Sequence, residues 1–316
     1  MSSNQGIGRE HLSMDIRIYL GPYRTASQHI YDILEKNADV FSDQNIVIVP
    51  PEAHRDALES ALKALGDGLP KADAGAQFIR EATQGSAAKR IVLLDHQIGG
   101  SVLRPVSRSL LFPPCGAAVA RYSTLLPLNS YRFFMATRNL TTLLPSCYGS
   151  ALGHAKIEEF STFVENIEIP KVKWSDLLNR VTRRQREERG PRHHVVTWKY
   201  EDYPRIWRDV IQAITGIENA QDLHGDSRPV NQGLSLYGCQ LMYQYLLKHK
   251  PAQAGDFEKI KRAFVLKFPN TDAPRRDDFW TAEVQDQMTF AYEDDWYYIE
   301  RMDNVATIQP RPNFLD

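Results

Sequence analysis

Five short stretches of the chain are almost continuously apolar and carry few charges: Ile16–Leu20, Asn45–Val49, Arg90–Leu94, Tyr131–Thr137 and His194–Lys199. Apolar runs of this length predict strands of a sheet that is covered on both faces. Stretches with helical character separate them: Ser27–Asn37, Glu52–Leu65, Gly116–Leu125 and Leu140–Leu152. This alternation predicts a three-layer α/β/α fold whose central parallel sheet has about five strands.

The second half of the chain is mainly helical. Residues 159–189 predict two helices, and four more follow the last strand, at Pro204–Ile214, Leu234–Lys248, Asp256–Leu266 and Ala282–Arg301. No linker marks a domain boundary, so we predict one α/β domain over residues 15–302. Within it, residues 159–190 are expected to form a helical lid or insert, and residues 203–302 a mainly helical C-terminal part. Residues 1–14 and 303–316 are expected to be terminal tails.

Charge and composition exclude several classes of protein. The 38 basic and 39 acidic side chains nearly cancel, which excludes bulk nucleic acid or an anionic membrane surface as a dominant electrostatic partner. No apolar run approaches the ~18 residues of a membrane span. The polar N-terminus lacks the apolar core of a signal peptide, and three scattered cysteines form no disulfide framework. We therefore expect a protein of the reducing cytoplasm.

The segment after the first strand predicts an anion site. It reads Gly21-Pro22-Tyr23-Arg24-Thr25-Ala26-Ser27-Gln28 and leads from a strand into a helix. Backbone N–H groups and the positive end of the helix dipole meet there, and Arg24 adds a planar donor fork. The segment lacks the Gly-Lys-Ser/Thr of a Walker A loop. An ordinary strand-to-helix turn with a Ser or Thr cap therefore stays open as the alternative.

A second cluster follows the fourth strand. Arg138 stands where that strand ends, and Ser146 lies eight residues later on the predicted helix. The two side chains could face one phosphate; alternatively, Arg138 forms a surface ion pair and Ser146 faces solvent. Two such loops on neighbouring parallel strands favour a ligand with two separated phosphates, bound across the carboxyl edge of the sheet.

These motifs resemble sulfotransferases that use 3′-phosphoadenosine 5′-phosphosulfate (PAPS), bacterial members above all, which share a P-loop-like fold. The family carries Gly-Pro-His-Lys-Thr-Gly-Ser-Thr after its first strand, and an Arg followed eight residues later by a Ser that together hold the 3′-phosphate of the nucleotide. Three later segments also resemble family segments in the same order, so that the likeness covers about residues 15–302. They are Val196–Asp202, Arg228–Ser235 and Phe290–Ile299.

The resemblance implies a set of site residues. PAPS would be held by Pro22, Tyr23, Arg24, Thr25, Ala26, Ser27, Gln28, Arg138 and Ser146. Arg24 would also stabilise charge on the departing 5′-phosphate. The chain departs from the family pattern in three places: Arg24 stands for the usual Lys, Ala26 for a Gly, and Gln28 for a hydroxyl residue. These departures bear on cofactor affinity and activity.

Transfer to a hydroxyl needs a proton acceptor, and Asp95-His96 follows the third strand. A His titrates near neutral pH, and cytosolic relatives carry their catalytic His after the corresponding strand. The resemblance therefore favours His96 as base, with Asp95 as its orienter or as a rival base. No His or Cys spacing typical of a metal site occurs in the sequence, so we expect no metal.

The expected reaction moves a sulfuryl group from PAPS to a hydroxyl or amine of a small-molecule, carbohydrate or lipid acceptor. Residues 159–189 and 99–114 are expected to shape the acceptor pocket. One alternative is a P-loop phosphotransferase, in which Asp95 holds Mg²⁺. Another is a non-catalytic nucleotide-binding or scaffold protein on the same fold, which Ala26 and Gln28 favour.

Overall fold

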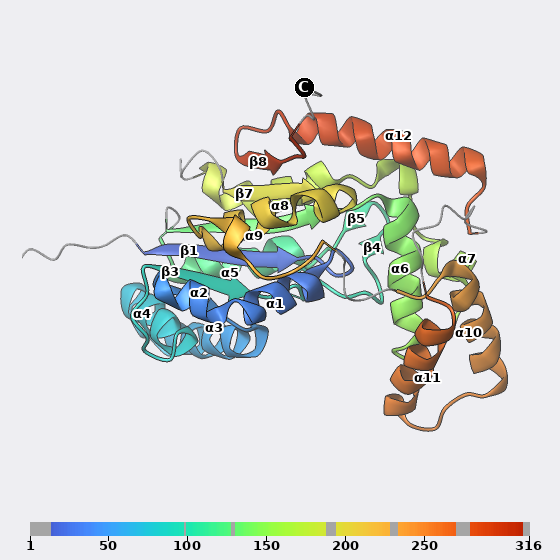
Figure 1. Ribbon diagram of the computed structural model, residues 1–316, viewed down its shortest axis with the longest axis horizontal. Helices are drawn as coiled ribbons and strands as arrows, with labels where there is room; N and C mark the ends of the chain where they lie inside the picture. The colour runs from blue at the N-terminus through green and yellow to red at the C-terminus, as the bar shows by residue number, and fades with distance from the viewer. Residues whose placement is uncertain are drawn as a thin grey trace, which may run out of the picture.

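Six parallel strands form the central sheet of the computed structural model, in the order β2-β3-β1-β6-β7-β8 (Figure 1). The model describes residues 14–97, 99–127, 130–187, 194–227, 233–269 and 279–311. Helices cover both faces of the sheet, so the predicted three-layer α/β/α fold is confirmed. The strands are β1 (Asp15–Gly21), β2 (Ile46–Val49), β3 (Arg90–Leu94), β6 (Tyr131–Thr137), β7 (Val195–Lys199) and β8 (Val305–Ile308).

Three helices cover one face of the sheet through an apolar core of their own: α1 (Ser27–Lys36), α2 (Ala38–Asp43) and α9 (Tyr203–Thr215). The spacing of their buried residues explains this packing. In α1, Ile30, Ile33 and Leu34 lie on one stripe, as the period of a helix requires. A larger core fills the opposite face, where the helices are α3 (Pro51–Gly66), α4 (Lys71–Ala82), α5 (Cys115–Leu125) and α8 (Trp174–Glu187).

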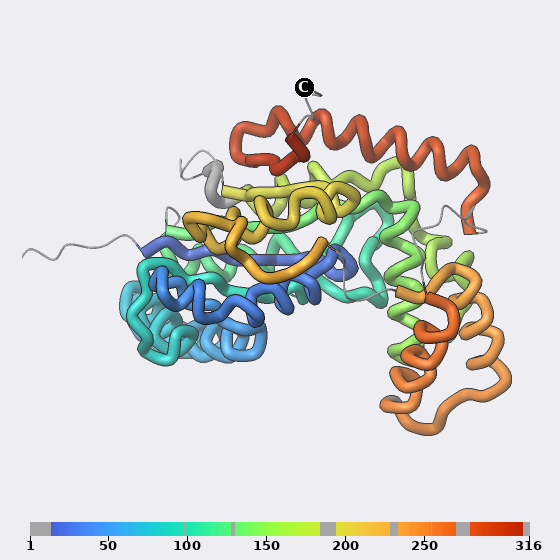
Figure 2. The backbone as a smooth tube through the Cα atoms, viewed as in Figure 1, coloured from blue at the N-terminus to red at the C-terminus, as the bar shows by residue number. Residues whose placement is uncertain are grey.

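The carboxyl ends of the strands point toward α6 (Leu140–Leu152), which lies across that edge of the sheet (Figure 1). Helices α7 (Phe160–Val164), α10 (Leu236–Lys248) and α11 (Ala254–Lys267) extend the molecule beyond α6. The long helix α12 (Ala282–Ile299) then runs back along the sheet to β8 (Figure 2). The α6 edge is the side of the fold on which the predicted anion loops lie.

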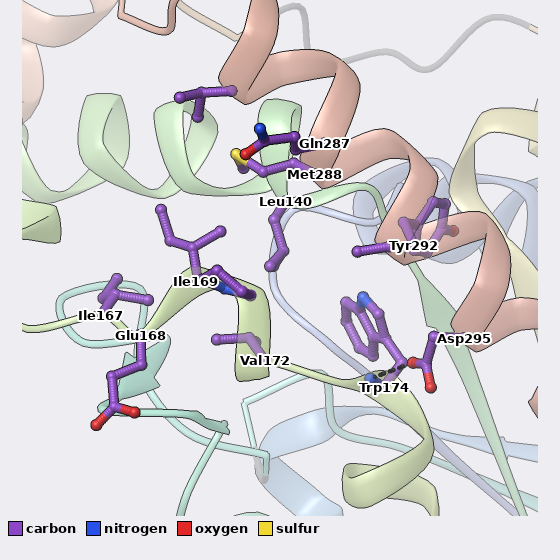
Figure 3. Close-up of a pocket in the computed structure, with 13 residues that line it drawn as sticks. Leu140, Ile167, Glu168, Ile169, Val172, Trp174, Gln287, Met288, Tyr292 and Asp295 are labelled. Carbon is purple, nitrogen blue, oxygen red and sulfur yellow. Dashed lines mark hydrogen bonds between the residues drawn. The ribbon is translucent and has the colours of Figure 1, made fainter.

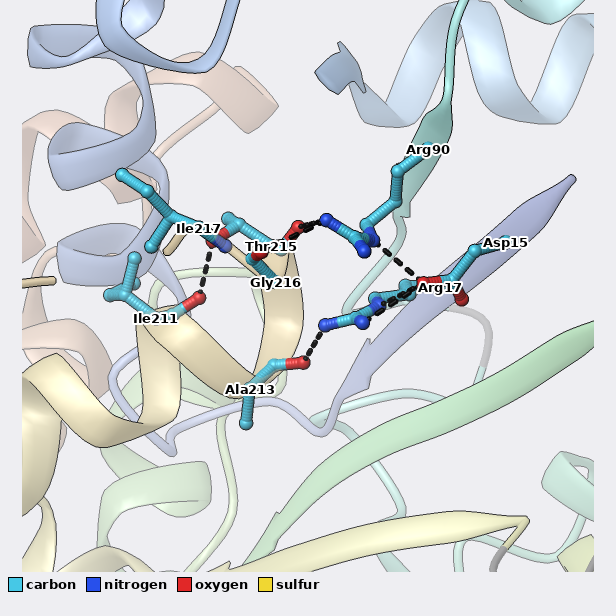
Figure 4. Close-up of polar contacts among 8 residues, drawn as sticks. All are labelled: Asp15, Arg17, Arg90, Ile211, Ala213, Thr215, Gly216 and Ile217. Carbon is cyan, nitrogen blue, oxygen red and sulfur yellow. Dashed lines mark hydrogen bonds and ion pairs between the residues drawn. The ribbon is translucent and has the colours of Figure 1, made fainter. Parts of the chain in front are cut away.

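At the opposite edge of the sheet, a cluster of charged side chains joins the strands to the end of α9. Asp15 accepts hydrogen bonds from Arg17 at 2.9 Å and from Arg90 at 2.6 Å. The same two guanidinium groups donate to backbone carbonyls at the end of α9, including Ala213 at 2.6 Å and Gly216 at 2.9 Å (Figure 4). Cations near the last carbonyls of a helix stabilise its C-terminus. This cluster therefore joins α9 to β1 and β3, away from the predicted site.

The observed elements depart from the sequence prediction mainly at small or weakly patterned segments. Residues 303–316 were expected to be a tail, but they supply β8, which pairs with β7. Helices α2 and α4 and the short hairpin of β4 (Val106–Ser107) and β5 (Leu110–Leu111) were not predicted. Residues 1–13 of the expected N-terminal tail lie outside the described residues. Among the helices described, none is long and apolar enough to cross a membrane.

Candidate anion site

The turn between β1 and α1 has an unusual backbone. Gly21, Arg24 and Ala26 all have φ between 67° and 85°, in the left-handed region that favours glycine. The Thr25 hydroxyl donates to the carbonyl of Pro22 at 2.6 Å and fixes the turn from inside. Within the described part of the chain, the amide N–H groups of residues 24–28 donate to no acceptor. Successive amides left unpaired in this way make a concave site for an anion.

Arg24 and Ser146 meet at this turn, although 122 residues separate them. The Nε of Arg24 donates to the Ser146 hydroxyl at 2.7 Å. Arg138 donates to the backbone carbonyl of Arg24. The structure therefore brings together the three side chains that the sequence singled out. It pairs Ser146 directly with Arg24, a contact that the spacing did not predict; the expectation was that Arg138 and Ser146 could face one phosphate.

The Arg138 guanidinium is held from several sides. Its Nε donates to the Thr142 hydroxyl at 3.0 Å, and its Cζ lies 4.2 Å from the centre of the Tyr200 ring. Its backbone carbonyl accepts a hydrogen bond from Trp174 Nε1 at 2.9 Å. A planar cation stacked on an aromatic face keeps its donor fork in a fixed orientation. Arg138 is thus positioned before any ligand binds.

The backbone between β6 and α6 is equally fixed. Asn139 caps α6 by accepting from the N–H of Thr141 at 3.0 Å, and Glu201 accepts from the N–H of Asn139 at 2.8 Å. Pro145 lies inside α6 and has no N–H for the carbonyl of Thr141, four residues earlier. Trp280 Nε1 donates to that carbonyl at 3.0 Å instead. Helix α6 therefore begins rigidly beside Arg138.

The two guanidinium groups of this site donate to neutral groups: Arg24 to the Ser146 hydroxyl, and Arg138 to the Thr142 hydroxyl and the carbonyl of Arg24. Among the described residues, neither Arg24 nor Arg138 forms an ion pair with a carboxylate. Arg138 is 7% exposed. Burial, and then the nearby charge of Arg138, lower the pKa of Arg24. Buried charges are normally paired, so two adjacent cations without a carboxylate point to an anionic ligand.

Sequence reasoning missed four contributors to the site: Thr142, Tyr200, Tyr31 and Gly233. A side chain on Gly233 would place its Cβ 2.7 Å from Nη2 of Arg24, so a larger residue here would shift the Arg24 guanidinium. Tyr200 and Gly233 do fall within segments that resemble the sulfotransferase family, which is the signal that could have found them. Residues 228–232 of the second segment lie outside the described residues.

His96 packs against the start of the same turn. A Cβ on Gly21 would lie 2.8 Å from the His96 Cβ, and the rings of Tyr23 and His96 are 5.1 Å apart, edge to face. Nδ1 of His96 is 2.7 Å from the Tyr31 hydroxyl. Burial, and then the charge of Arg55, lower the pKa of His96 to about 4. The ring is therefore neutral at pH 7, as a proton acceptor must be.

Asp95 is 1% exposed and engaged within the protein. One of its carboxylate oxygens accepts from Arg55 at 3.1 Å and from the N–H of Gln97 at 3.0 Å. Its own N–H donates to the carbonyl of Tyr19. Asp95 thus braces the end of β3 through Arg55, Gln97 and Tyr19.

Of the remaining predicted residues, Pro22, Tyr23 and Ser27 form or support the turn, whereas Gln28 lies on the surface of α1. Ser27 is buried, and its hydroxyl lies 2.9 Å from that of Tyr19 beneath the turn. Pro22 supplies the carbonyl that Thr25 uses, and Tyr23 lines the side facing His96. Gln28 is exposed, and its amide donates to Asp32 at 2.8 Å, one helical turn along α1. Gln28 therefore points away from Arg24 and Ser146.

A substitution at Ala26 can test whether the backbone of the turn is strained. Its φ of 68° costs an alanine about 1–2 kcal/mol. Glycine avoids this penalty but loses about 0.4–1 kcal/mol because its unfolded chain is more flexible. Ala26→Gly is expected to raise the free energy of unfolding by about 1 kcal/mol, measured by urea denaturation. The control is Ala76→Gly, at an exposed position inside α4, which should lower stability by about 1 kcal/mol. A loss of stability in both variants would contradict strain at Ala26.

Comparisons with protein-family models, curated proteins and solved structures found no match. Within the part of the chain that the structure describes, no group of three or more His, Cys, Asp or Glu side chains is arranged to hold a metal ion.

Proposed function

We propose that this protein is a sulfotransferase that transfers the sulfuryl group of PAPS to a hydroxyl or amine of an acceptor. The observation that carries the proposal is the pair Arg24 and Arg138, two adjacent guanidinium groups without a carboxylate partner among the described residues. They follow β1 and β6, neighbouring strands whose connections leave in opposite directions. Ligands of open α/β sheets bind at this kind of switch point.

The proposed roles follow from position. Arg138 holds one phosphate of the nucleotide. The Ser146 hydroxyl, which is hydrogen-bonded to Arg24, contributes to the same phosphate site. The unpaired amides of residues 24–28 bind the other phosphate at the start of α1. Arg24 then lies where negative charge develops on the leaving phosphate, and a fixed cation there lowers the barrier without reorganisation.

In the proposed transfer, His96 accepts the proton of the acceptor hydroxyl. The hydroxyl oxygen bonds to sulfur while the bond between sulfur and the bridging phosphate oxygen breaks. The electron pair leaves with the 5′-phosphate, giving adenosine 3′,5′-bisphosphate. With a pKa of about 4 the His96 ring is neutral at pH 7 but weakly basic, so it accepts the proton as the hydroxyl oxygen bonds to sulfur and becomes more acidic. The Tyr31 hydroxyl, which is hydrogen-bonded to Nδ1 of His96, orients the ring.

A second candidate is nucleotide binding without transfer, which Gln28 favours. This residue stands where the family has a phosphate-contacting hydroxyl, and its amide is engaged with Asp32 on the surface of α1. Under this proposal the protein binds PAPS or its product but does not consume PAPS with any acceptor. Release of adenosine 3′,5′-bisphosphate in the presence of an acceptor library distinguishes the two.

Thermal unfolding with adenosine 3′,5′-bisphosphate, in metal-free buffer, tests the shared part of both proposals. At a ligand concentration of about 100 times the dissociation constant, the protein should gain about 2.7 kcal/mol of stability. Adenosine 5′-monophosphate lacks the 3′-phosphate and should give a much smaller gain. Equal stabilisation by both nucleotides would remove Arg138 from the site, and a strict need for Mg²⁺ would favour a phosphotransferase.

A further inference from the structure

A cavity of about 370 Å³ lies beside the start of α6 (Figure 3). Its walls come from three parts of the chain: the start of α6, residues 167–174, and one side of α12. This volume is within the range of small-molecule sites in proteins. The cavity shares the start of α6 with the candidate anion site, and two contacts connect the two places: Trp174 Nε1 donates to the carbonyl of Arg138, and Tyr292 donates to Glu201, which accepts from the N–H of Asn139.

The floor of the cavity is buried and its mouth is exposed. Leu140, Val172, Trp174 and Met288 form the floor, and each is less than 10% exposed. The side chains of Glu168, Pro170, Gln287 and Ala291 are exposed and surround the mouth. The cavity is therefore an apolar chamber that a molecule can enter from solvent.

The polar groups of the floor are already satisfied by the protein. Asp295 accepts from the N–H of Trp174 at 2.7 Å and from the N–H of Ser175 at 3.1 Å. The Tyr292 hydroxyl bonds to Thr137 at 2.8 Å and to Glu201 at 3.1 Å. No buried side-chain atom of the described lining residues lacks a hydrogen-bond partner. A polar ligand group would find no partner in the floor, and its burial would be unfavourable.

We propose that this cavity binds a neutral, apolar small molecule, with its hydrocarbon body against Trp174 and Met288 and any polar group at the mouth. Part of the lining, residues 167–174, belongs to the segment expected to shape the acceptor pocket. The proposal nevertheless does not depend on nucleotide binding, because it concerns a ligand of opposite chemistry. Burial of apolar surface against the floor supplies the affinity.

The test uses the full chain and the neutral fluorophore N-phenyl-1-naphthylamine. We expect saturable binding of one probe per chain, with quenching of tryptophan fluorescence because Trp174 forms part of the floor. Ala291→Phe narrows the exposed mouth and should weaken binding at least tenfold. Val284→Phe, on another part of the lining, should do the same. Ala282→Phe is the matched control, since it makes the same change at an exposed position of α12 outside the cavity.

Three outcomes overturn the proposal: no saturable binding by the natural protein, unchanged binding in both lining variants, or equal loss in the Ala282→Phe control. Displacement of the probe by adenosine 3′,5′-bisphosphate would also overturn it, because the cavity would then belong to the nucleotide site. Failure of the nucleotide to bind at all would contradict only the proposed function. Unchanged urea midpoints show that a lining variant remains folded.

Discussion

Arg138→Ala is expected to raise the dissociation constant for adenosine 3′,5′-bisphosphate by about 30-fold or more. Removing one partner of a buried, hydrogen-bonded charge pair costs about 2–5 kcal/mol, and every 1.4 kcal/mol is tenfold in affinity. Arg138 is buried and fixed by Thr142 and Tyr200, so another side chain cannot readily replace it. Isothermal titration calorimetry in metal-free buffer measures the change.

Arg24→Met should give two effects of opposite sign. Without nucleotide, this variant loses a desolvated cation next to Arg138 but keeps a side chain of similar length, so its free energy of unfolding should rise by about 1 kcal/mol. With nucleotide, most of the ligand-induced stabilisation should disappear. Sites that hold uncompensated charge for a ligand show this trade between stability and function.

Arg132→Ala controls for the loss of a positive charge in this region. Arg132 lies on β6 as well, but its side chain is exposed. It should bind the nucleotide within about twofold of the natural protein, because exposed charges are well screened. If Arg132→Ala and Arg138→Ala weakened binding equally, the effect would be one of overall charge. If Arg24→Met lowered the stability of the free protein, its guanidinium would be a structural group.

The sheet could be predicted because its strands are buried on both faces. Arg90–Leu94 and Tyr131–Thr137 match β3 and β6 residue for residue, since an apolar run flanked by polar residues has clear limits. Strand β8 was not predicted, because it is mostly not buried. It is an edge strand of four residues, only one of them buried, and its short run Val305–Ile308 includes the small residue Ala306 and the polar residue Thr307. Pairing with β7 makes it a strand.

The candidate site was predictable in position but not in its contacts. Polar residues after neighbouring parallel strands must meet at one edge of a sheet, which placed Arg24 and Arg138 together. The contact of Arg24 with Ser146 depends on the left-handed backbone at Arg24, which residue types do not indicate. The contributions of Tyr200 and Gly233 depend on the packing of segments distant in the chain. Periodicity carries no information on such packing.

Acidification from pH 6.5 to pH 4 is expected to remove about 3 kcal/mol of stability through His54 alone. This residue is 0% exposed. Burial lowers its pKa from 6.5 to about 4, an effect that the charges of Arg55 and Arg121 increase and a hydrogen bond to the carbonyl of Leu94 opposes. Between these values the unfolded chain binds a proton and the folded chain does not. Stability is therefore complete above pH 6.5 and falls toward pH 4.

Two other groups titrate in ways that can be separated from His54. His96 also has a pKa of about 4, but it is partly exposed, so its contribution in the same range should be smaller. Burial raises the pKa of Asp15, but Arg17 and Arg90 outweigh this effect and lower it below its ordinary value. The stability from Asp15 is present above that ordinary value and is lost only at still lower pH.

His54→Gln isolates the buried imidazole. Glutamine cannot titrate, and its amide can still face the carbonyl of Leu94 and the Tyr122 hydroxyl, which lies 2.8 Å from Nε2 of His54. Urea unfolding at pH 7, 6, 5 and 4.5 should show a slope against pH reduced by about half or more in this variant. His249→Gln, which removes an exposed imidazole, should keep most of the slope. An unchanged slope in His54→Gln would contradict the prediction, because it would mean that His54 binds a proton as readily in the folded protein as in the unfolded chain.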